Sequence, residues 1–250
     1  MKIQSTSTSV IVPFYNERDS LPETFKRLEA VVAARPDWEV LFVDDGSTDG
    51  GAEYLRDAIT GAAWAHVIPH DQNLGLGAAL KTGFAAARGD IVCTMDSDCT
   101  YPPERIAELV EAVQRGADIA TASPWHPDVG GAAGGIRFFV SRCASWLHSL
   151  VLGRRIYTLT SLCRAYAAPV VRKIVPVSGG FGAGAELLIR ASLAGYEILE
   201  IPMALAVRQH GVSKMSFLGS VADHLVLMMR TMAWRLRPAV VAPQRNVRGI

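Results

Sequence analysis

The chain has 250 residues, half of them apolar, and a formal net charge of +1. This length and composition predict one large domain or two small ones with a sizeable core, and the near-zero charge predicts no general affinity for nucleic acid. The four cysteines contain no C-x-x-C pair, which argues against a disulfide framework or a zinc site and predicts reduced thiols.

The first 125 residues alternate between short apolar runs and amphipathic segments. The apolar runs predict strands at residues 9–12, 40–43, 66–68, 90–95 and 117–122. The segments between them predict helices at residues 21–34, 50–59, 75–88 and 103–115. This alternation is typical of βαβ units, so we expect an α/β fold with a mostly parallel, Rossmann-like sheet flanked by helices.

The second half has a less regular pattern. A stretch rich in Gly and Pro at residues 124–135 predicts a loop. Beyond it we expect helices and strands at residues 136–152 (helix), 160–167 (strand), 183–194 (helix) and 196–208 (a strand pair interrupted at Pro202). The last periodic segment, 217–236, predicts a long apolar helix with few charges.

Polar side chains follow each of the first four predicted strands. The strands lead into residues 15–17, 44–45, 70–73 and 96–98, and each of these four segments contains at least one carboxylate. If the strands are parallel and adjacent, these segments meet at one rim of the sheet, where ligands bind in α/β folds. We therefore expect a binding site at this rim.

The sequence Asp96-Ser97-Asp98 predicts a metal site there. Two carboxylates one residue apart repel each other and are costly to remove from water, so a neighbouring cation would offset the cost. Mg²⁺ or Mn²⁺ prefers carboxylate oxygens and would in turn hold a diphosphate. The alternative for a D-x-D sequence is a solvated turn.

Two other segments at the rim are ambiguous. Residues 44–49 suit a turn followed by a helix cap, or a carboxylate that accepts hydrogen bonds from a base or ribose. Residues 73–77 could bring backbone N–H groups to a phosphate at the start of a helix, but they do not match G-x-G-x-x-G. The chain also lacks a P-loop, which excludes the P-loop nucleotide hydrolases.

These segments resemble family 2 of the inverting glycosyltransferases, whose fold is called glycosyltransferase A. The likeness rests on four motifs in order, V-I-V-P-F-Y-N-E (10–17), V-D-D-G-S-T-D (43–49), N-L-G-L-G-A-A (73–79) and D-S-D (96–98). Within the family, the second half resembles the dolichyl- and polyprenyl-phosphate mannose synthases in R-F-F-V-S-R (137–142), S-L-C-R-A-Y (161–166), the run with Glu186 and Glu200 (185–202), and R-Q-H-G-V-S-K (208–214).

The resemblance implies a role for each matching residue. The residues around the nucleotide sugar would be Pro13, Tyr15, Glu17, Asp44, Asp45 and Asp96. The ligands of the metal cofactor, Mg²⁺ or Mn²⁺, would be Asp96 and Asp98. The catalytic residues would be Asp98, Arg137, Ser141, Arg208 and Lys214, with Arg208 and Lys214 at the donor diphosphate and Arg137 and Ser141 at the acceptor phosphate. One departure is Thr100, which stands where related synthases have a glutamine that can bind metal.

The activity implied is transfer of a sugar, mannose or glucose, from a nucleotide sugar to a polyprenyl phosphate. A phosphate monoester is already anionic at pH 7 and needs little help from a base. Two alternatives remain open. In the first alternative, the acceptor is a hydroxyl group of a glycan or lipid, and Glu186 acts as the base. Glu186 also suits a structural ion pair. The other alternative is a catalytically silent protein that binds nucleotide sugars.

The resemblance assigns residues 1–214 to the catalytic domain and leaves 215–250 as a helical tail. The tail has two interpretations. Its apolar periodicity, followed by Trp234 and Arg235, fits an amphipathic helix at a membrane surface, and equally a core helix that covers the sheet. The chain shows no basic, apolar leader and no run of ~18 apolar residues. We therefore expect a cytoplasmic protein, which the first interpretation places peripherally at the inner face of the membrane.

Overall fold

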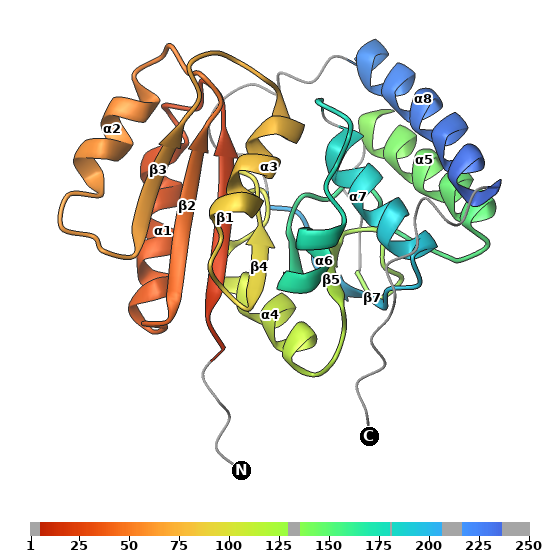
Figure 1. The fold of residues 1–250 in the computed structure, drawn as a ribbon, viewed down its shortest axis with the longest axis horizontal. Coiled ribbons are helices and arrows are strands. Elements are labelled where there is room, and N and C mark those ends of the chain that lie inside the picture. The colour runs from red at the N-terminus through yellow and green to blue at the C-terminus, as the bar shows by residue number, and fades with distance from the viewer. Residues whose placement is uncertain (1–5, 130–135, 181, 207–216, 237–250) are drawn as a thin grey trace.

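The computed structural model describes residues 6–129, 136–180, 182–206 and 217–236 of the chain, with backbone only at 136–140 and 217–222. A seven-stranded sheet runs through the molecule in the order β3-β2-β1-β4-β6-β5-β7 (Figure 1). The strands are β1 Thr8–Phe14, β2 Trp38–Asp44, β3 Ala65–Pro69, β4 Ile91–Thr94, β5 Ile119–Ser123, β6 Arg164–Ala167 and β7 Ile198–Pro202.

Four of the six strand pairings are parallel, and β6 runs antiparallel to both of its neighbours, β4 and β5. The expected α/β fold with a mostly parallel sheet is confirmed. β1, β2 and β3 follow each other as neighbours, and β4 pairs with the other side of β1. The first four strands are therefore parallel and adjacent, as the prediction of a polar rim requires.

Helices cover both faces of the sheet (Figure 1). They are α1 Leu21–Ala33, α2 Gly51–Ala58, α3 Leu76–Ala86, α4 Ile106–Gln114, α5 Ile136–Leu152, α6 Ala168–Lys173, α7 Gly182–Leu193 and α8 Phe217–Leu236, with a 3₁₀ turn at Pro103–Arg105 before α4. Along β1, Val10 and Val12 pack with α1 and α4 on one face, whereas Ile11 packs with α3 and α7 on the other. This alternation follows from the two-residue period of a strand, and it explains why β1 is apolar throughout its middle.

The second half differs from the expectations in three places. The predicted strand 160–167 forms only as β6, Arg164–Ala167. It is followed at once by α6, which the sequence pattern did not predict and which begins with Pro169 in its first turn, a position that suits proline. The strand pair expected over 196–208 yields β7 alone, ending at Pro202, and residues 203–206 are not strand; 207 and 208 lie outside the described residues.

The C-terminal helix α8 lies alongside α5, and its main contacts are with α5 and α7 (Figure 1). Leu227 and Thr231 are buried, whereas Leu225, Met229 and Leu236 are exposed. α8 therefore covers other helices rather than lying directly on the sheet, and one side of it presents apolar groups to the surroundings. None of the described helices is long and apolar enough to cross a bilayer.

Candidate active site at the carboxyl rim of the sheet

The carboxyl ends of β1, β2 and β4 lie side by side. β1 and β2 are paired as far as Asp44, and β4 is paired with β1 as far as Thr94. Asp45 and Asp96 follow within two residues of those ends, on strands that neighbour β1 at about 4.8 Å. The predicted convergence of these segments at one rim is thus confirmed by the topology.

Hydrogen bonds join the loops after β1 and β2. Asn16 donates its backbone N–H to Ser47 Oγ (2.9 Å), and its side-chain oxygen accepts from the N–H of Thr48 (2.7 Å). The N–H of Arg18 donates to Asp49 Oδ2 (2.8 Å). Asn16 has a positive φ of 53°, a conformation that asparagine tolerates better than most residues. The two loops therefore form one connected wall of the rim.

Of the predicted nucleotide-sugar contacts in this part of the chain, Tyr15 and Glu17 lie in the loop after β1, and Pro13 lies in β1 itself. Pro13 is buried within β1, Tyr15 is 36% exposed, and Glu17 is half-buried, with Oε2 accepting from Ser20 Oγ at 3.2 Å. Tyr15 has the most accessible side chain of the three, which suits contact with a ligand. Their roles toward a nucleotide stay predictions.

Asp44 and Asp45 are both buried and shape the second loop. Asp44 Oδ1 accepts from the N–H of Ser47 (2.9 Å). Asp45 accepts from the N–H groups of Leu74 (3.0 Å) and Gly75 (2.8 Å), and its Oδ1 lies 2.8 Å from His70 Nδ1. The turn interpretation of residues 44–49 therefore holds for Asp44, and Asp45 caps the N–H groups of the segment that leads into α3.

This capping changes the interpretation of residues 73–77. The N–H groups of Leu74 and Gly75 are bonded to Asp45, and that of Gly77 donates to the carbonyl of Gly179 (2.8 Å). These three amides are therefore not available to a phosphate, because protein acceptors already hold them. A carboxylate at this helix N-terminus is itself favoured by the helix dipole.

The Asp96-Ser97-Asp98 loop is held from α1. Thr24 Oγ1 donates to the carbonyl of Ser97 (2.7 Å) and lies 3.3 Å from Cys99 Sγ. Cys99 adopts a positive φ of 54°, and the N–H of Thr100 donates to Asp98 Oδ1 (3.0 Å). Burial raises the pKa of the Cys99 thiol, so this side chain acts as a neutral group that packs the loop. Asp96 and Asp98 are half-buried.

Asp96 and Asp98 could supply part of the ligand set of Mg²⁺ or Mn²⁺. The described residues contain no group of three or more His, Cys, Asp or Glu side chains that could share a metal ion. Mg²⁺ is commonly held by one or two carboxylates together with waters and the phosphates of a substrate. Asp96 and Asp98 therefore suit a cation that arrives with a diphosphate, and less well one bound by protein alone.

Tyr101, which follows the Asp96–Asp98 loop, belongs to the core. It is 6% exposed and packs in the cluster on the α4 side of the sheet. Burial raises the pKa of its phenol, which a hydrogen bond to Ser161 only partly offsets. The side chain is therefore neutral at physiological pH and packs in the core after the end of β4.

Three charged residues in the motifs of the second half bind backbone groups. Arg164 is fully buried and donates to Thr121 Oγ1 (3.2 Å) and to the carbonyls of Leu159 (2.6 Å) and Gly184. A guanidinium satisfied in this way ties β6 to β5, to the loop before β6 and to α7. Its role is structural.

Glu186 and Glu200 have the same character. Glu186 has no exposed surface, and its oxygens accept from the N–H groups of Val177 (2.8 Å) and Ser178 (2.7 Å), with Arg190 at 3.4 Å. The structural interpretation of Glu186 is thus the one that the geometry favours. Glu200 accepts from the N–H groups of residues 157 and 158, each at 2.8 Å.

Of the predicted catalytic residues, Ser141 and Arg137 lie on α5. They are four residues apart and so share one side of the helix. Ser141 Oγ lies 2.8 Å from Thr160 Oγ1. The side chain of Arg137, and the whole of Arg208 and Lys214, lie outside the described part of the chain, so their positions relative to Asp98 stay predictions.

Comparison with known proteins identifies the family. The pattern described as Glycosyl transferase family 2 matches residues 9–174, which is more than half of the chain and includes every rim segment. The chain belongs to glycosyl transferase family 2. The resemblance carried by the four motifs of the first half is thereby confirmed.

Relatives of this glycosyltransferase cover most of its length. It is 36% identical over 219 residues to polyprenol monophosphomannose synthase of Mycolicibacterium smegmatis, a match that covers 84% of this chain and 81% of that protein. It is also 36% identical over 231 residues to undecaprenyl-phosphate mannosyltransferase of Micrococcus luteus, with 88% and 91% covered. Against undecaprenyl-phosphate 4-deoxy-4-formamido-L-arabinose transferase of Pseudomonas fluorescens the identity is 32% over 212 residues, and the match spans 60% of that protein's length.

Solved structures confirm the fold of the glycosyltransferase. Glucosyl-3-phosphoglycerate synthase from Mycobacterium tuberculosis with phosphoglyceric acid superposes with a TM-score of 0.66 at 22% identity, covering 96% of this chain and 82% of that one. The same enzyme with Mn²⁺, uridine diphosphate and glucosyl-3-phosphoglycerate gives 0.63 at 23% identity, with 97% and 82% covered. At this identity the likeness establishes the glycosyltransferase A fold.

Two residues that support the site of this glycosyltransferase were not singled out from the sequence. Thr24 holds the Asp96–Asp98 loop from more than 70 positions away, and Thr82 Oγ1 lies 2.8 Å from His70 Nε2 behind Asp45. Neither residue stands in a motif with the groups that it contacts. A polar side chain on the core face of an otherwise apolar helix is the signal that would have found Thr24, since such a group needs a partner.

Proposed function

We propose that this family 2 enzyme transfers a sugar, with inversion at the anomeric carbon, from a nucleoside-diphosphate sugar to the phosphate of a polyprenyl lipid. The relatives named for mannose transfer to polyprenol or undecaprenyl phosphate favour mannose, with glucose as the other candidate. A third relative is named for a modified arabinose, so the family does not restrict the sugar strictly.

The observation that carries the proposal is the rim itself. Four parallel, adjacent strands end at this rim, with Asp44 and Asp45 at the end of β2 and Asp96 and Asp98 after β4, and hydrogen bonds link the loops after β1 and β2. A rim of that kind suits a nucleotide, whose base and ribose offer donors to carboxylates, and whose diphosphate needs a cation beside them.

The donor would bind with its nucleoside against Pro13, Tyr15, Glu17, Asp44 and Asp45. Asp96 and Asp98 would hold Mg²⁺ or Mn²⁺, which when bound neutralises the charge of the diphosphate as it departs. Arg208 and Lys214 would add positive charge on the same diphosphate. The M. tuberculosis synthase with the same fold has been crystallised with either ion and uridine diphosphate.

The acceptor phosphate would lie against Arg137 and Ser141 on α5. A guanidinium pairs with a phosphate through two parallel hydrogen bonds, which orients the attacking oxygen as well as attracting it. Because that oxygen is already anionic, the residues here need to position it rather than deprotonate it.

Glu186 supports a phosphate acceptor indirectly. A hydroxyl acceptor would need a general base, and both Glu186 oxygens are occupied by backbone donors in a fully buried position. A base must come within hydrogen-bond reach of the proton that it takes. We therefore favour the lipid phosphate over a hydroxyl group of a glycan.

The chain would act at a membrane surface, because the acceptor is a lipid. We propose that residues 1–214 form the catalytic domain and 215–250 a tail that lies on the inner face of the membrane. The exposed apolar side of α8, with Leu225, Met229 and Leu236, supports this arrangement.

The test is a transfer assay with undecaprenyl phosphate and manganese against a panel of GDP-mannose, UDP-glucose and UDP-N-acetylglucosamine. We expect one donor to give a lipid-linked sugar and the others to give little. Equal, low incorporation from every donor, or product only when a glycan hydroxyl is supplied, would reject the proposal.

Replacing Asp98 by Ala should lower the turnover rate by about a hundredfold or more, because the diphosphate loses its cation. Asp57→Ala is the matched control, since Asp57 is exposed on α2, away from the rim. The readout is the initial rate at saturating manganese. Wild-type activity in the Asp98 variant would show that the metal assignment is wrong.

A further inference from the structure

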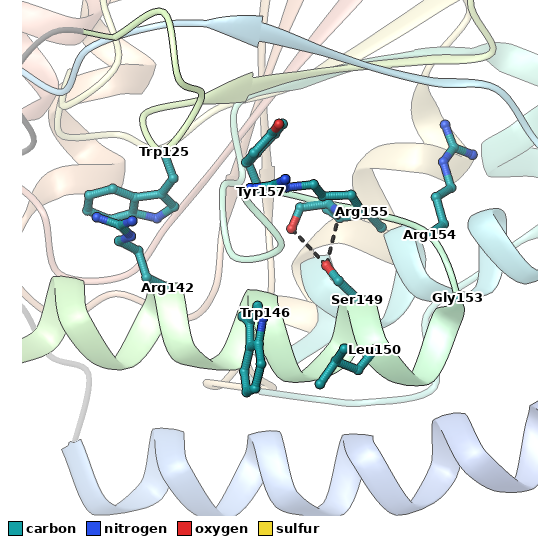
Figure 2. A pocket seen from close by; sticks show the side chains of 10 residues that line it. Trp125, Arg142, Trp146, Ser149, Leu150, Gly153, Arg154, Arg155 and Tyr157 are labelled. Atoms are coloured by element: carbon teal, nitrogen blue, oxygen red, sulfur yellow. Dashed lines mark hydrogen bonds between the residues drawn. The ribbon is translucent and has the colours of Figure 1, made fainter.

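A second site lies beside the C-terminal half of α5. A pocket of about 500 Å³ is lined by Trp125, which follows β5, by Arg142, Trp146 and Leu150 of α5, and by residues 153–157 (Figure 2). None of these residues lies in the loops after β1, β2, β3 or β4, although Trp125 follows β5, whose carboxyl end lies at the same edge of the sheet. The pocket therefore shares no residue with the carboxylate loops where the donor would bind.

Three arginines line this pocket, and its lining contains no acidic side chain. Arg154 donates to the carbonyls of Tyr196 (3.2 Å) and Ile198 (3.0 Å), and the guanidinium of Arg155 lies 4.7 Å from the centre of the Tyr157 ring. Both contacts hold an arginine in place without neutralising its charge. Among the described residues, no carboxylate forms an ion pair with Arg142, Arg154 or Arg155.

Glu200 and Asp128 lie near the pocket, and both have other partners. Glu200 accepts from the N–H groups of Tyr157 and Thr158, each at 2.8 Å. Asp128 lies 3.3 Å from His126, whose ring contacts that of Tyr157. The lining thus carries three arginines and no acidic side chain, and the pocket retains the sign that attracts an anion.

The surface around the pocket is apolar and aromatic. On α5, Trp146 is 61% and Leu150 is 59% exposed, and Leu147 is also exposed. On the neighbouring α8, Leu225 and Met229 are exposed as well. Figure 2 shows Trp146 and Leu150 projecting from α5 next to the pocket. Tryptophan and arginine beside exposed aliphatic groups are typical of the membrane interface, and an apolar patch of this kind usually marks an interaction surface.

We propose that this pocket binds the phosphate headgroup of an anionic bilayer phospholipid, with Trp146 and Leu150 placed at the boundary of the acyl chains. Arginine is suited to this role because its guanidinium binds phosphate oxygens in pairs. The pocket would hold α5 at the membrane while Arg137 and Ser141 receive the acceptor. Because Arg142 follows Ser141 directly, the phospholipid phosphate would lie towards Arg155, beyond the end of α5. From Ser141 to Leu152 the helix rises by ~17 Å, which leaves room for two separate phosphates.

The proposal goes beyond the transfer reaction, because it does not depend on the identity of the donor or the acceptor. Its test is sedimentation of the full chain with vesicles of phosphatidylcholine, alone or mixed with phosphatidylglycerol. We expect tighter binding to the mixed vesicles, and Arg155→Glu should weaken that binding about tenfold. Arg155→Lys keeps the charge and should retain most of the binding.

Arg115→Glu is the matched control, because Arg115 is an exposed arginine on the far side of the sheet, after α4, and should bind as wild type does. Equal binding of the wild type to both kinds of vesicle would overturn the proposal. So would an Arg155→Glu variant that binds like the wild type, which would assign the attraction to other basic residues of the chain.

A spectroscopic test addresses Trp146 directly. Brominated phosphatidylcholine in mixed vesicles should quench part of the tryptophan fluorescence, and Trp146→Phe should remove most of that quenching. Unchanged quenching in this variant would show that another tryptophan meets the bilayer and that the pocket is not seated there.

The transfer assay separates this site from the acceptor site. With a short-chain polyprenyl phosphate in detergent, Arg155→Glu should keep wild-type transfer within about twofold, since no bilayer is present. A loss of transfer in detergent as large as the loss of vesicle binding would place Arg155 in acceptor binding and overturn the proposal. Failure of the wild type to transfer any sugar, with vesicle binding intact, would count against the proposed function alone.

Discussion

At the scale of single residues, the carboxylates of the rim divide into two kinds. Asp44 and Asp45 are buried and receive hydrogen bonds from the loops that they organise. Asp96 and Asp98 are half-buried on a loop held from behind by Thr24. A buried carboxylate that already accepts hydrogen bonds from the backbone has little capacity left for a cation, although a remaining lone pair can accept from a nucleoside. The second pair is therefore the better place for a cation.

Glu186→Gln tests the same distinction in the second half. The amide can accept at one position only, and its NH₂ group would face the N–H of Val177 or Ser178. We expect a loss of about 2 kcal/mol in the free energy of unfolding, which lowers Tm by about 4–8 °C in a domain of this size. Activity per folded molecule should stay close to that of the wild type.

The measurement is a thermal melt together with the rate of the folded fraction. Glu53→Gln is the control, because Glu53 is exposed on α2 and its weak ion pair with Arg56 contributes little. Loss of activity at an unchanged Tm would identify Glu186 as a base and would revive a hydroxyl acceptor.

The residues that could be predicted from sequence are those whose chemistry shows locally. Asp96 and Asp98 could be predicted because two like charges directly after an apolar strand are visible in the sequence itself, and their repulsion indicates a neighbouring cation. The sequence places His70 at the end of the third strand. Its contacts with Asp45 and Thr82 could not be predicted, because these residues are 25 and 12 positions away from it. Contacts of that kind depend on the tertiary fold and leave no local pattern.

At the scale of elements, the start of α3 is fixed by the segment before α7. Gly77 donates to the carbonyl of Gly179, and a Cβ at position 77 would clash with the carbonyl oxygen of Ser178. Glu186 holds the same segment from α7. The glycines of residues 73–77, which the sequence suggested as a phosphate loop, thus allow two backbones to approach each other closely.

Gly77→Ala should therefore destabilise the protein, although alanine is the better helix former by about 1 kcal/mol. The obstructing atoms belong to backbone, which cannot turn aside as a side chain can. Gly184→Ala is the matched control in α7, where the new Cβ would meet its neighbours at 3.7 Å or more. We expect a lower Tm for the first variant and an equal or higher Tm for the second. Equal melting of both would show that the segment 178–180 moves away at little cost.

The contact between α5 and α8 predicts a pH dependence. His148 is 1% exposed, its ring lies 5.9 Å from that of His224, and neither of its nitrogens has a hydrogen-bond partner among the described residues. Burial, and then the proximity of His224, lower the pKa of His148 to about 4. Burial also lowers the pKa of His224, against the opposing effect of Asp223.

Because the pKa of His148 is lower in the folded chain than its unfolded value of about 6.5, the unfolded chain binds the extra proton between about pH 6.5 and 4. Stability is therefore full above that window and falls as the pH decreases through it, by up to ~3 kcal/mol. Denaturant melts at several pH values should show this slope, and His148→Phe should reduce it. His66→Gln, at an exposed histidine of β3, should leave it unchanged; an equal slope in the His148 variant would exclude this cause.

At the scale of the whole molecule, the first half of the fold could be predicted and part of the second half could not. Parallel strands joined by helices follow from a repeated local pattern and from the handedness of βαβ units. β6 breaks that pattern, because the chain returns from α5 to insert an antiparallel strand between β4 and β5. Nothing local to residues 164–167 specifies that direction.

Because four strands of one sheet end at the rim, a ligand bound there should stabilise the whole domain. A ligand that binds only the folded state stabilises it by about 2.7 kcal/mol at a hundredfold excess over its Kd. For a chain of this size, that amounts to a rise in Tm of about 5–10 °C. We expect this rise with manganese and a nucleoside diphosphate together, and little with either one alone.

Scanning GDP and UDP with manganese then identifies the nucleotide of the donor without requiring turnover. The larger shift marks the nucleotide that the rim recognises, and Asp98→Ala should remove most of it, whereas Asp57→Ala should not. A shift of equal size in EDTA, or in the Asp98 variant, would mean that the nucleotide binds without a cation. Groups of the protein itself would then offset the repulsion between Asp96 and Asp98 at the end of β4.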